Sequence, residues 1–248
     1  TEIVSQARTA CGVSLGFESL RLDALPPVVS LAGVVIDDQA SGTRFASVRE
    51  AIVELEVLPI LYGRIQIDRA ALLEPTATLV VRGSTLANLP RCLVPDPDVE
   101  ATVPIVLGVR ELRVERGKLD VIVPGSAELR AAEIDISLTP SPGGGAELAL
   151  AVQGSTITLA AATVPVPRVR LLAHIAGALT SPRALSIERL DVEALGGKLA
   201  VSGSVDLLGP VYEARVALTL PLESLPPLLP QLPPMRGRLD LDGGFAGT

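Results

Sequence analysis

The sequence predicts a mainly β protein, an elongated antiparallel sheet built from recurring hairpins. Apolar residues recur two apart through most of the 248 residues, which is the period of a strand with one dry face. Turn-forming residues separate these stretches at intervals of about ten residues. A glycine, a basic residue and then alternating apolar residues occur together four times, at Gly63–Ile67, Gly117–Val121, Gly197–Val201 and Gly237–Leu241. Glycine suits a turn because it reaches positive φ without steric cost.

The N-terminal part is expected to begin with a short helix over residues 1–10, ended by Cys11-Gly12, because glycine is a usual helix stop. Alternation then predicts strands, with a one-residue slip after Phe17, a change of phase at Gly33 and an interruption at Pro75. The expected strands cover Val13–Leu22, Val29–Ile36, Val48–Leu58, Ile65–Ile67 and Ala77–Val81. Leu86–Glu100 is rich in Pro, Asp and Asn and is expected to be a loop or a boundary.

The remainder is expected to consist almost entirely of strands joined by short turns. Pro140–Gly145 is expected to be a hairpin tip or a slack loop, and Glu223–Pro234 an apolar helical turn or an extended flap packed across the sheet. The expected strands are Val109–Glu115, Lys118–Val123, Ala127–Ala131, Ile134–Thr139, Glu147–Gln153, Thr156–Ala161, Val164–Leu172, Leu185–Ala194, Lys198–Leu207, Tyr212–Leu220 and Arg238–Asp242.

The composition excludes some classes of function. A net charge of -7 without a dense basic patch argues against nucleic-acid binding. Apolar residues make up 48% of the chain, yet no apolar run is long enough to span a membrane as a helix. Aromatic residues make up only 2%, with no Trp, so aliphatic side chains must line the dry face. Either this is compositional drift, or the sheet lines a cavity that another molecule fills.

The sequence shows no catalytic or metal-binding pattern. His174 is the single histidine, and its simplest interpretation is a histidine at the end of a strand. Cys11 and Cys92 follow no metal-ligand spacing, so neither a metal nor a cofactor is expected. Two free or buried thiols are favoured over a disulfide, which would form in an oxidising compartment. The chain is therefore not expected to be an enzyme.

The run Pro59–Pro75 resembles the N-terminal signature of the AsmA-like and TamB-like proteins of Gram-negative envelopes. Its matching positions are Ile60, Leu61, Gly63, Ile65, Ile67, Asp68, Leu72 and Pro75, followed by Leu79, whereas Ala70 and Ala77 replace larger aliphatic residues. Asn88-Leu89 and the closing Leu225–Thr248 are similar to later elements of the same family. On this basis we expect an N-terminal AsmA-like section over residues 1–95 and a continuation of the sheet over residues 96–248.

The resemblance implies a curled sheet that is open along one side and forms a hydrophobic groove. It implies a section of a periplasmic bridge that conducts phospholipids between the inner and outer membranes, held to the inner membrane by an anchor outside this fragment. Phospholipid acyl chains would be its ligand, and an outer-membrane barrel protein a possible partner. The expected lining residues are Ile65, Ile67, Leu119, Val121, Ile134, Ile136, Leu148, Leu150, Val152, Leu199, Val201, Val216, Leu218 and Leu220.

Two alternatives remain open from the sequence. The same apolar residues would also form the closed core of an adhesive β-sandwich, in which two sheets meet face to face. The family resemblance equally permits a structural scaffold for the assembly of outer-membrane proteins.

Overall fold

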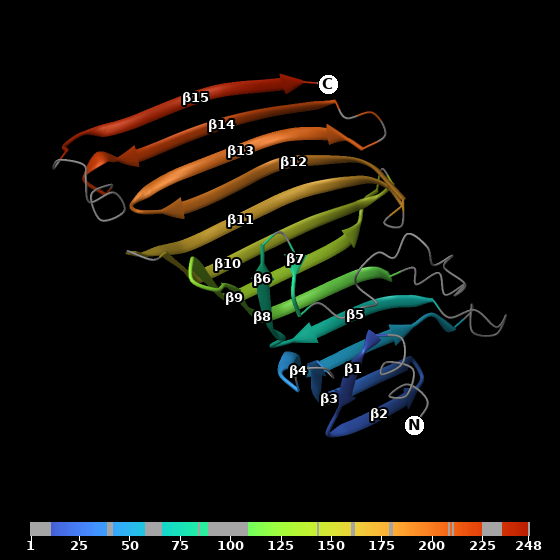
Figure 1. Ribbon diagram of the computed structural model, residues 1–248. Coiled ribbons are helices and arrows are strands. Elements are labelled where there is room, and N and C mark those ends of the chain that lie inside the picture. Colours follow the sequence, from blue (N-terminus) through green and yellow to red (C-terminus); the bar gives the residue numbers. More distant parts are fainter. Residues whose placement is uncertain are drawn as a thin grey trace. The chain divides into compact units, whose positions relative to one another are not determined.

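The protein is mainly β. A computed structural model describes residues 11–38, 42–57, 66–83, 85–88, 109–142, 144–159, 162–178, 181–207, 209, 211–224 and 235–247 (Figure 1). The chain divides into two compact units, unit 1 over Thr1–Pro124 and unit 2 over Gly125–Thr248. The boundary expected between residues 95 and 96 lies outside the described residues.

Unit 1 is a mixed sheet. Its strands are β1 (Val13–Gly16), β2 (Ser19–Ala24), β3 (Pro27–Asp38), β4 (Arg44–Leu55), β5 (Ile67–Leu73), β6 (Thr76–Arg82), β7 (Thr85–Leu86) and β8 (Val109–Val123). Both β1 and β2 pair with β3, which pairs with β4, and β4 pairs with β5 and with the start of β6, all antiparallel. These strands confirm the alternation of the N-terminal part.

The expectation of a wholly antiparallel sheet is wrong at β8, which runs parallel to both β5 and β6. Parallel neighbours need a connection of a dozen or more residues. The chain between Leu86 and Val109 is long enough for this, whereas the local alternation of apolar residues carries no information about strand direction. The last two residues of β6 pair with β7 instead, as an antiparallel ladder.

A line of irregular residues crosses the strands of unit 1. Glu74 and Arg116 have φ values of 50° and 53°, and Gly33 has a φ of 62°. The β5–β8 and β6–β8 pairings share one offset, from Leu73–Glu115 to Thr76–Lys118, so Glu74 lies opposite Arg116. The main chain remains hydrogen-bonded there, because Glu74 N–H donates to Glu115 O at 2.8 Å and Lys118 N–H to Pro75 O at 2.8 Å. We call this line, Gly33, Arg49, Glu74 and Arg116, the crease.

The crease is an ion-paired row. The Glu74 carboxylate lies 3.1 Å from Arg49 Nη1 of β4 and 2.8 Å from Arg116 Nη2 of β8. The Glu18 side chain lies over Gly33 so closely that a Cβ there would clash with it. Charged side chains from neighbouring strands therefore follow the crease, and its glycine position has no room for a larger residue.

Unit 2 is an antiparallel meander in which each strand pairs with the next (Figure 1). Its strands are β9 (Ala127–Pro140), β10 (Ala146–Leu159), β11 (Ala162–Ala178), β12 (Ser181–Ala194), β13 (Gly197–Asp206), β14 (Tyr212–Pro221) and β15 (Arg238–Gly247). A short 3₁₀ turn, Leu222–Ser224, follows β14. This part confirms the antiparallel expectation and the hairpin rhythm.

Three pairs of expected short strands are single long strands. β8, β9 and β10 each continue through the point at which the apolar phase slips, near Arg116, Glu133 and Gly154. These residues have φ values of 53°, 51° and 67°. A residue in the left-handed region adds one position to a strand and reverses its alternation without ending it. The strand ends expected from the sequence pattern at these places are therefore wrong.

The glycine pattern behaves differently at its three described copies. Gly117 lies inside β8, so the turn expected there is absent. Between β12 and β13 the turn is made by Leu195 and Gly196, both at positive φ, as a two-residue hairpin requires. Gly197 is the first residue of β13, where a Cβ would lie 2.5 Å from Thr219 O. Gly237 precedes β15 at a φ of 125°, as predicted.

Several expectations fall on residues that the structure does not describe. They are the N-terminal helix, the Leu-rich turn with Gly63 and Ile65, most of Leu86–Glu100, and residues 225–234 of the apolar flap. Cys11 is disulfide-bonded, which corrects the preference for free thiols. Cys92, the other cysteine of the sequence, lies outside the described residues.

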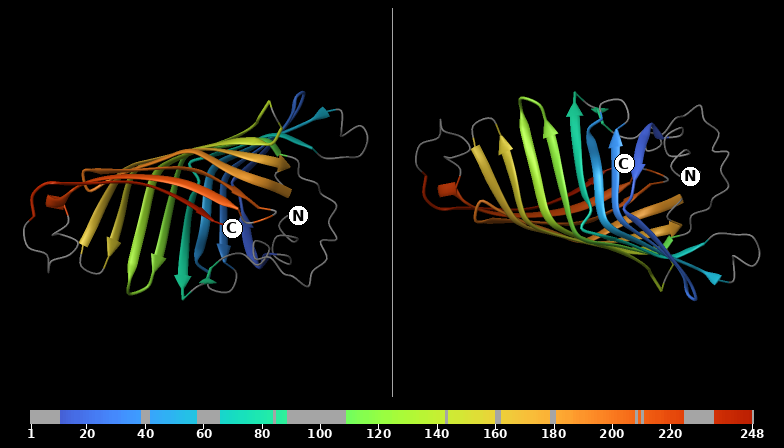
Figure 2. Two further views of the ribbon diagram at one scale, coloured as in Figure 1. Left: turned by 90° about the horizontal axis from the view of Figure 1, so that it is seen from above. Right: turned by 90° about the horizontal axis from the view of Figure 1, so that it is seen from below.

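Within each unit the described strands form one layer. The extensive contacts between elements all join hydrogen-bonded neighbours. Figure 1 shows the strands of unit 2, from yellow-green to red, side by side in sequence order, and Figure 2 shows their direction turning progressively along the series. None of the described large side chains is fully buried. The described part of each unit therefore lacks the interlocked core of a β-sandwich.

Candidate functional site

The candidate site is the apolar face of unit 2. Directly paired residues in an antiparallel sheet point to the same face, as do residues two apart along a strand. One apolar row crosses every strand of the unit: Ile134, Val152, Val169, Val192, Leu199, Leu218 and Leu241. At about 4.8 Å between strands, this row is roughly 29 Å long.

Two further rows lie beside the first on the same face. One contains Ile136, Leu150, Leu171, Leu190, Val201 and Val216, and ends at Gly243. The other contains Leu138, Leu148, Ala173, Ile187, Gly203, Ala214 and Phe245. A register shift between Ile187 and Leu190 keeps both residues on this face despite their odd spacing. The three rows make one continuous aliphatic surface, which we call the apolar face.

The structure brings most of the expected lining residues together. Nine of the ten that lie in unit 2 belong to the three rows, and the tenth, Leu220, lies two residues after Leu218 on the same face and pairs with Leu239. In unit 1, Leu119 and Val121 of β8 pair with Ala77 and Leu79. Ile67 pairs with Leu55 beside a register shift, and Ile65 is outside the described residues.

Sequence reasoning missed about half of the apolar face. β11 and β12 contribute Val169, Leu171, Leu190 and Val192, which alternate as clearly as the expected lining residues. Both strands were predicted from the sequence, so the alternation that places these four residues on one face was visible in it. The phase slip between Val166 and Val169, and the register shift before Leu190, obscured which residues share a face.

Exposure on the apolar face increases toward β15. Val152 and Ala173 are buried among their neighbours, whereas Leu241 is 54% exposed and Phe245 60%. β15 has a partner on one side only among the described strands, so its side chains lack the second row that covers those of the inner strands. Large exposed aliphatic and aromatic side chains in continuous array are typical of a surface that binds another apolar molecule.

One buried polar group interrupts the apolar side of β10. Ser155 is 5% exposed and pairs with Val166 just beyond the Gly154 bulge. Its hydroxyl has no hydrogen-bond partner among the residues that the structure describes. Such an orphan group costs free energy relative to an apolar side chain of the same size.

The opposite face of unit 2 is polar. It carries Asp135, Arg170, Asp191 and Asp242 in one cross-strand row, with alanines between them. Asp240 of β15 accepts hydrogen bonds from Arg238 Nε at 2.8 Å and Thr219 Oγ1 at 3.0 Å, which lower the pKa of its carboxyl. His174 pairs with Glu147 and Ser186 on this face. The two faces of the sheet therefore differ sharply in polarity.

The described residues show no cluster of His, Cys, Asp and Glu suited to a metal ion. Along the same described ranges, no helix has the length and hydropathy needed to cross a bilayer. No family model, curated protein or solved structure matches this chain.

Proposed function

We propose that this protein is a section of a lipid-conducting bridge of the AsmA/TamB type, which binds phospholipid acyl chains along its apolar face. The observation that carries the proposal is the set of three apolar rows across β9 to β15, without a second layer among the described residues of unit 2. A closed sandwich would interlock these side chains with those of another sheet.

The free energy favours this ligand class. Transferring an acyl chain of about sixteen carbons from water to an apolar surface gains on the order of 12 kcal/mol when burial is complete, at ~0.8 kcal/mol per CH₂. Contacts of this kind are nondirectional, so a chain can slide from one row to the next without breaking specific bonds. Phe245 is the one aromatic residue in the three rows, and apart from Gly203 and Gly243 the other residues are aliphatic. An open hydrophobic groove is the geometry that we propose for this face.

The location that we propose is the periplasm, with attachment to the inner membrane as the AsmA/TamB resemblance implies. The disulfide at Cys11 supports an oxidising compartment, because such bonds persist in the bacterial periplasm and are rare in the cytosol. The net charge of -7 fits a partner other than nucleic acid.

Photo-crosslinking in cells tests the proposal. A crosslinking amino acid at Leu150 or Leu218 would lie on the apolar face, and the matched controls at Ala151 and Ala217 lie next to them on the polar face. We expect phospholipid adducts, identified by mass spectrometry, from the leucine positions and not from the alanine positions.

Other products would contradict lipid conduction. Adducts joining two copies of this chain through Leu150 and Leu218 would favour a closed sandwich. Adducts to an outer-membrane barrel protein, without lipid, would favour a scaffold in outer-membrane protein assembly. Equal lipid labelling from both faces would indicate nonspecific contact.

A further inference from the structure

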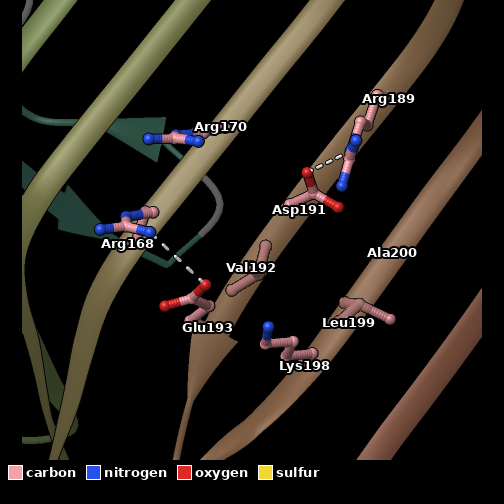
Figure 3. Close-up of a pocket in the computed structure, with 9 residues that line it drawn as sticks. All are labelled: Arg168, Arg170, Arg189, Asp191, Val192, Glu193, Lys198, Leu199 and Ala200. Atoms are coloured by element: carbon pink, nitrogen blue, oxygen red, sulfur yellow. Dashed lines mark hydrogen bonds and ion pairs between the residues drawn. The ribbon is translucent and has the colours of Figure 1, made fainter.

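The polar face of unit 2 carries a hollow of about 280 Å³ over β11, β12 and β13 (Figure 3). Six charged side chains line it: Arg168, Arg170, Arg189, Asp191, Glu193 and Lys198. Four cations thus accompany two carboxylates, on a chain whose formal net charge is -7. The hollow is a local excess of positive charge on an acidic protein.

Both carboxylates of the hollow are already engaged by arginines. Arg189 Nε donates a hydrogen bond to Asp191, two residues along the same strand. Arg168 Nη1 lies 3.8 Å from Glu193 Oε1 on the neighbouring strand. Figure 3 draws both pairs as dashed lines. The Arg170 and Lys198 side chains have no hydrogen bond or ion pair with the part of the chain that the structure describes.

The register explains why these two cations remain unpaired. Arg170 lies between Ala151 of β10 and Asp191 of β12, but Asp191 is held by Arg189. Lys198 lies between Glu193 and Thr219, but Glu193 is held by Arg168. Ala200 lies beside Asp191 and leaves space above the sheet. The unpaired cations therefore border an open volume instead of filling it.

We propose that this hollow binds a phosphate group. Arg170 and Lys198 are two strands apart and offset by two residues along the strand, or roughly 12 Å in all, a span that two long side chains can close on one anion. The guanidinium of Arg170 can donate two parallel hydrogen bonds to phosphate oxygens, and the ammonium of Lys198 adds a compact charge. Arg168 and Arg189 keep further N–H donors beyond those used by the carboxylates.

The phosphate group has two possible sources, a phospholipid headgroup or a soluble phosphate ester. The site lies on the face opposite to the apolar rows, so it is independent of the acyl-chain surface. The variants Arg170→Gln and Lys198→Gln remove the unpaired cations from exposed positions. Arg215→Gln is the matched control, an exposed cation on the polar face of β14 and outside the hollow.

The experiment titrates the full chain with inorganic phosphate and with glycerol 3-phosphate at low salt, followed by NMR or calorimetry. We expect saturable binding that weakens about tenfold or more in the double variant Arg170→Gln/Lys198→Gln and is unchanged in Arg215→Gln. Circular dichroism checks that the variants remain folded. Flotation with vesicles of phosphatidylglycerol or phosphatidylcholine then distinguishes the sources.

Capture by vesicles that depends on Arg170 and Lys198 would assign a lipid headgroup. Binding of the soluble esters alone would assign a soluble ligand. The proposal is overturned when no phosphate compound binds, when chloride competes at equal concentration, or when Arg215→Gln loses as much affinity as the double variant. These results do not depend on lipid adducts at Leu150, so either proposal can fail alone.

Discussion

Unit 1 and unit 2 connect their strands by different means. The described ion pairs of unit 1 mostly cross from one strand to another, as in Arg69 with both Glu54 and Glu111, which together raise the pKa of Arg69. In unit 2 most described ion pairs stay within one strand, two residues apart, as in Arg238–Asp240. Apolar rows cross the strands of both units, as in Leu31, Ala51 and Leu72 of unit 1, so the difference lies in the ion pairs.

The difference shows what each sheet can expose. Cross-strand ion pairs add stability to a sheet, but this contribution is weakened by salt. Aliphatic rows across a single layer leave apolar surface available to a ligand. The apolar face of unit 2 is the surface that we propose for lipid, and unit 1 is stabilised in addition by cross-strand ion pairs and by the disulfide at Cys11.

The largest expected effect is the loss of that disulfide. Replacing Cys11 with Ser should destabilise unit 1 by about 2–4 kcal/mol, because the cross-link restricts its unfolded state. Unit 2 contains no cysteine and should be unaffected. Hydrogen exchange resolved by strand measures both units in one sample, and equal loss of protection in β12 would show that the units do not unfold separately.

A smaller effect is expected at the crease. Glu74→Gln removes both arginine contacts and should cost about 1 kcal/mol at low salt, with the loss shrinking in about 1 M salt as charges are screened. Glu133→Gln is the control in unit 2, since Glu133 has a similar φ but no ion pair with the described residues. Urea titration of both variants measures this, and an equal effect at Glu133 would assign the loss to backbone conformation.

Removing the unsatisfied hydroxyl of Ser155 is expected to preserve or raise the free energy of unfolding, unlike the two changes above. Ser155→Ala should leave unit 2 as stable or raise its free energy of unfolding by up to about 1 kcal/mol, because a buried unsatisfied group is removed. Thermal unfolding compares this variant with Ser204→Ala at an exposed position of β13. Destabilisation by Ser155→Ala alone would mean that the hydroxyl has a partner.

The smallest effect is expected with pH, at the end of unit 2. Hydrogen bonds from its own backbone N–H and from Gly237 N–H lower the pKa of Glu223, and Arg238 and Thr219 lower that of Asp240. Because both folded pKa values lie below the unfolded ones, the carboxylates stabilise β14 and β15 above about pH 4. That stabilisation is lost as pH falls through the folded pKa values. The hydrogen-exchange rate of the Gly237 amide, corrected for its intrinsic pH dependence, should rise over that pH range. In Glu223→Gln, the part of this rise that comes from protonation of Glu223 should be absent.

The sequence predicted the strands well because alternation is a local property. Leu199 and Val201 were placed on one face from their spacing alone, and the register confirms it. The sequence pattern could not predict features that depend on distant parts of the chain or on a single backbone angle. The parallel pairing of β8 with β5 depends on the path of the chain after Leu86, and the continuity of β9 through Glu133 depends on a φ value that no pattern specifies.

The hydrogen bonds that join the end of β14 to the start of β15 have a practical consequence for labelling the protein. Leu222 N–H donates to Gly237 O at 3.0 Å, and Gly237 N–H donates to Glu223 Oε1 at 3.0 Å, so the two chain ends that flank residues 225–234 are clasped together. Residues inserted between Ser224 and Met235 need not separate β14 from β15. The hydrogen bonds of Leu222 and Glu223 with Gly237 hold the register of the two strands whatever the length of the inserted segment. A fluorophore or an affinity tag inserted there is expected to leave the pairing of β14 with β15 intact.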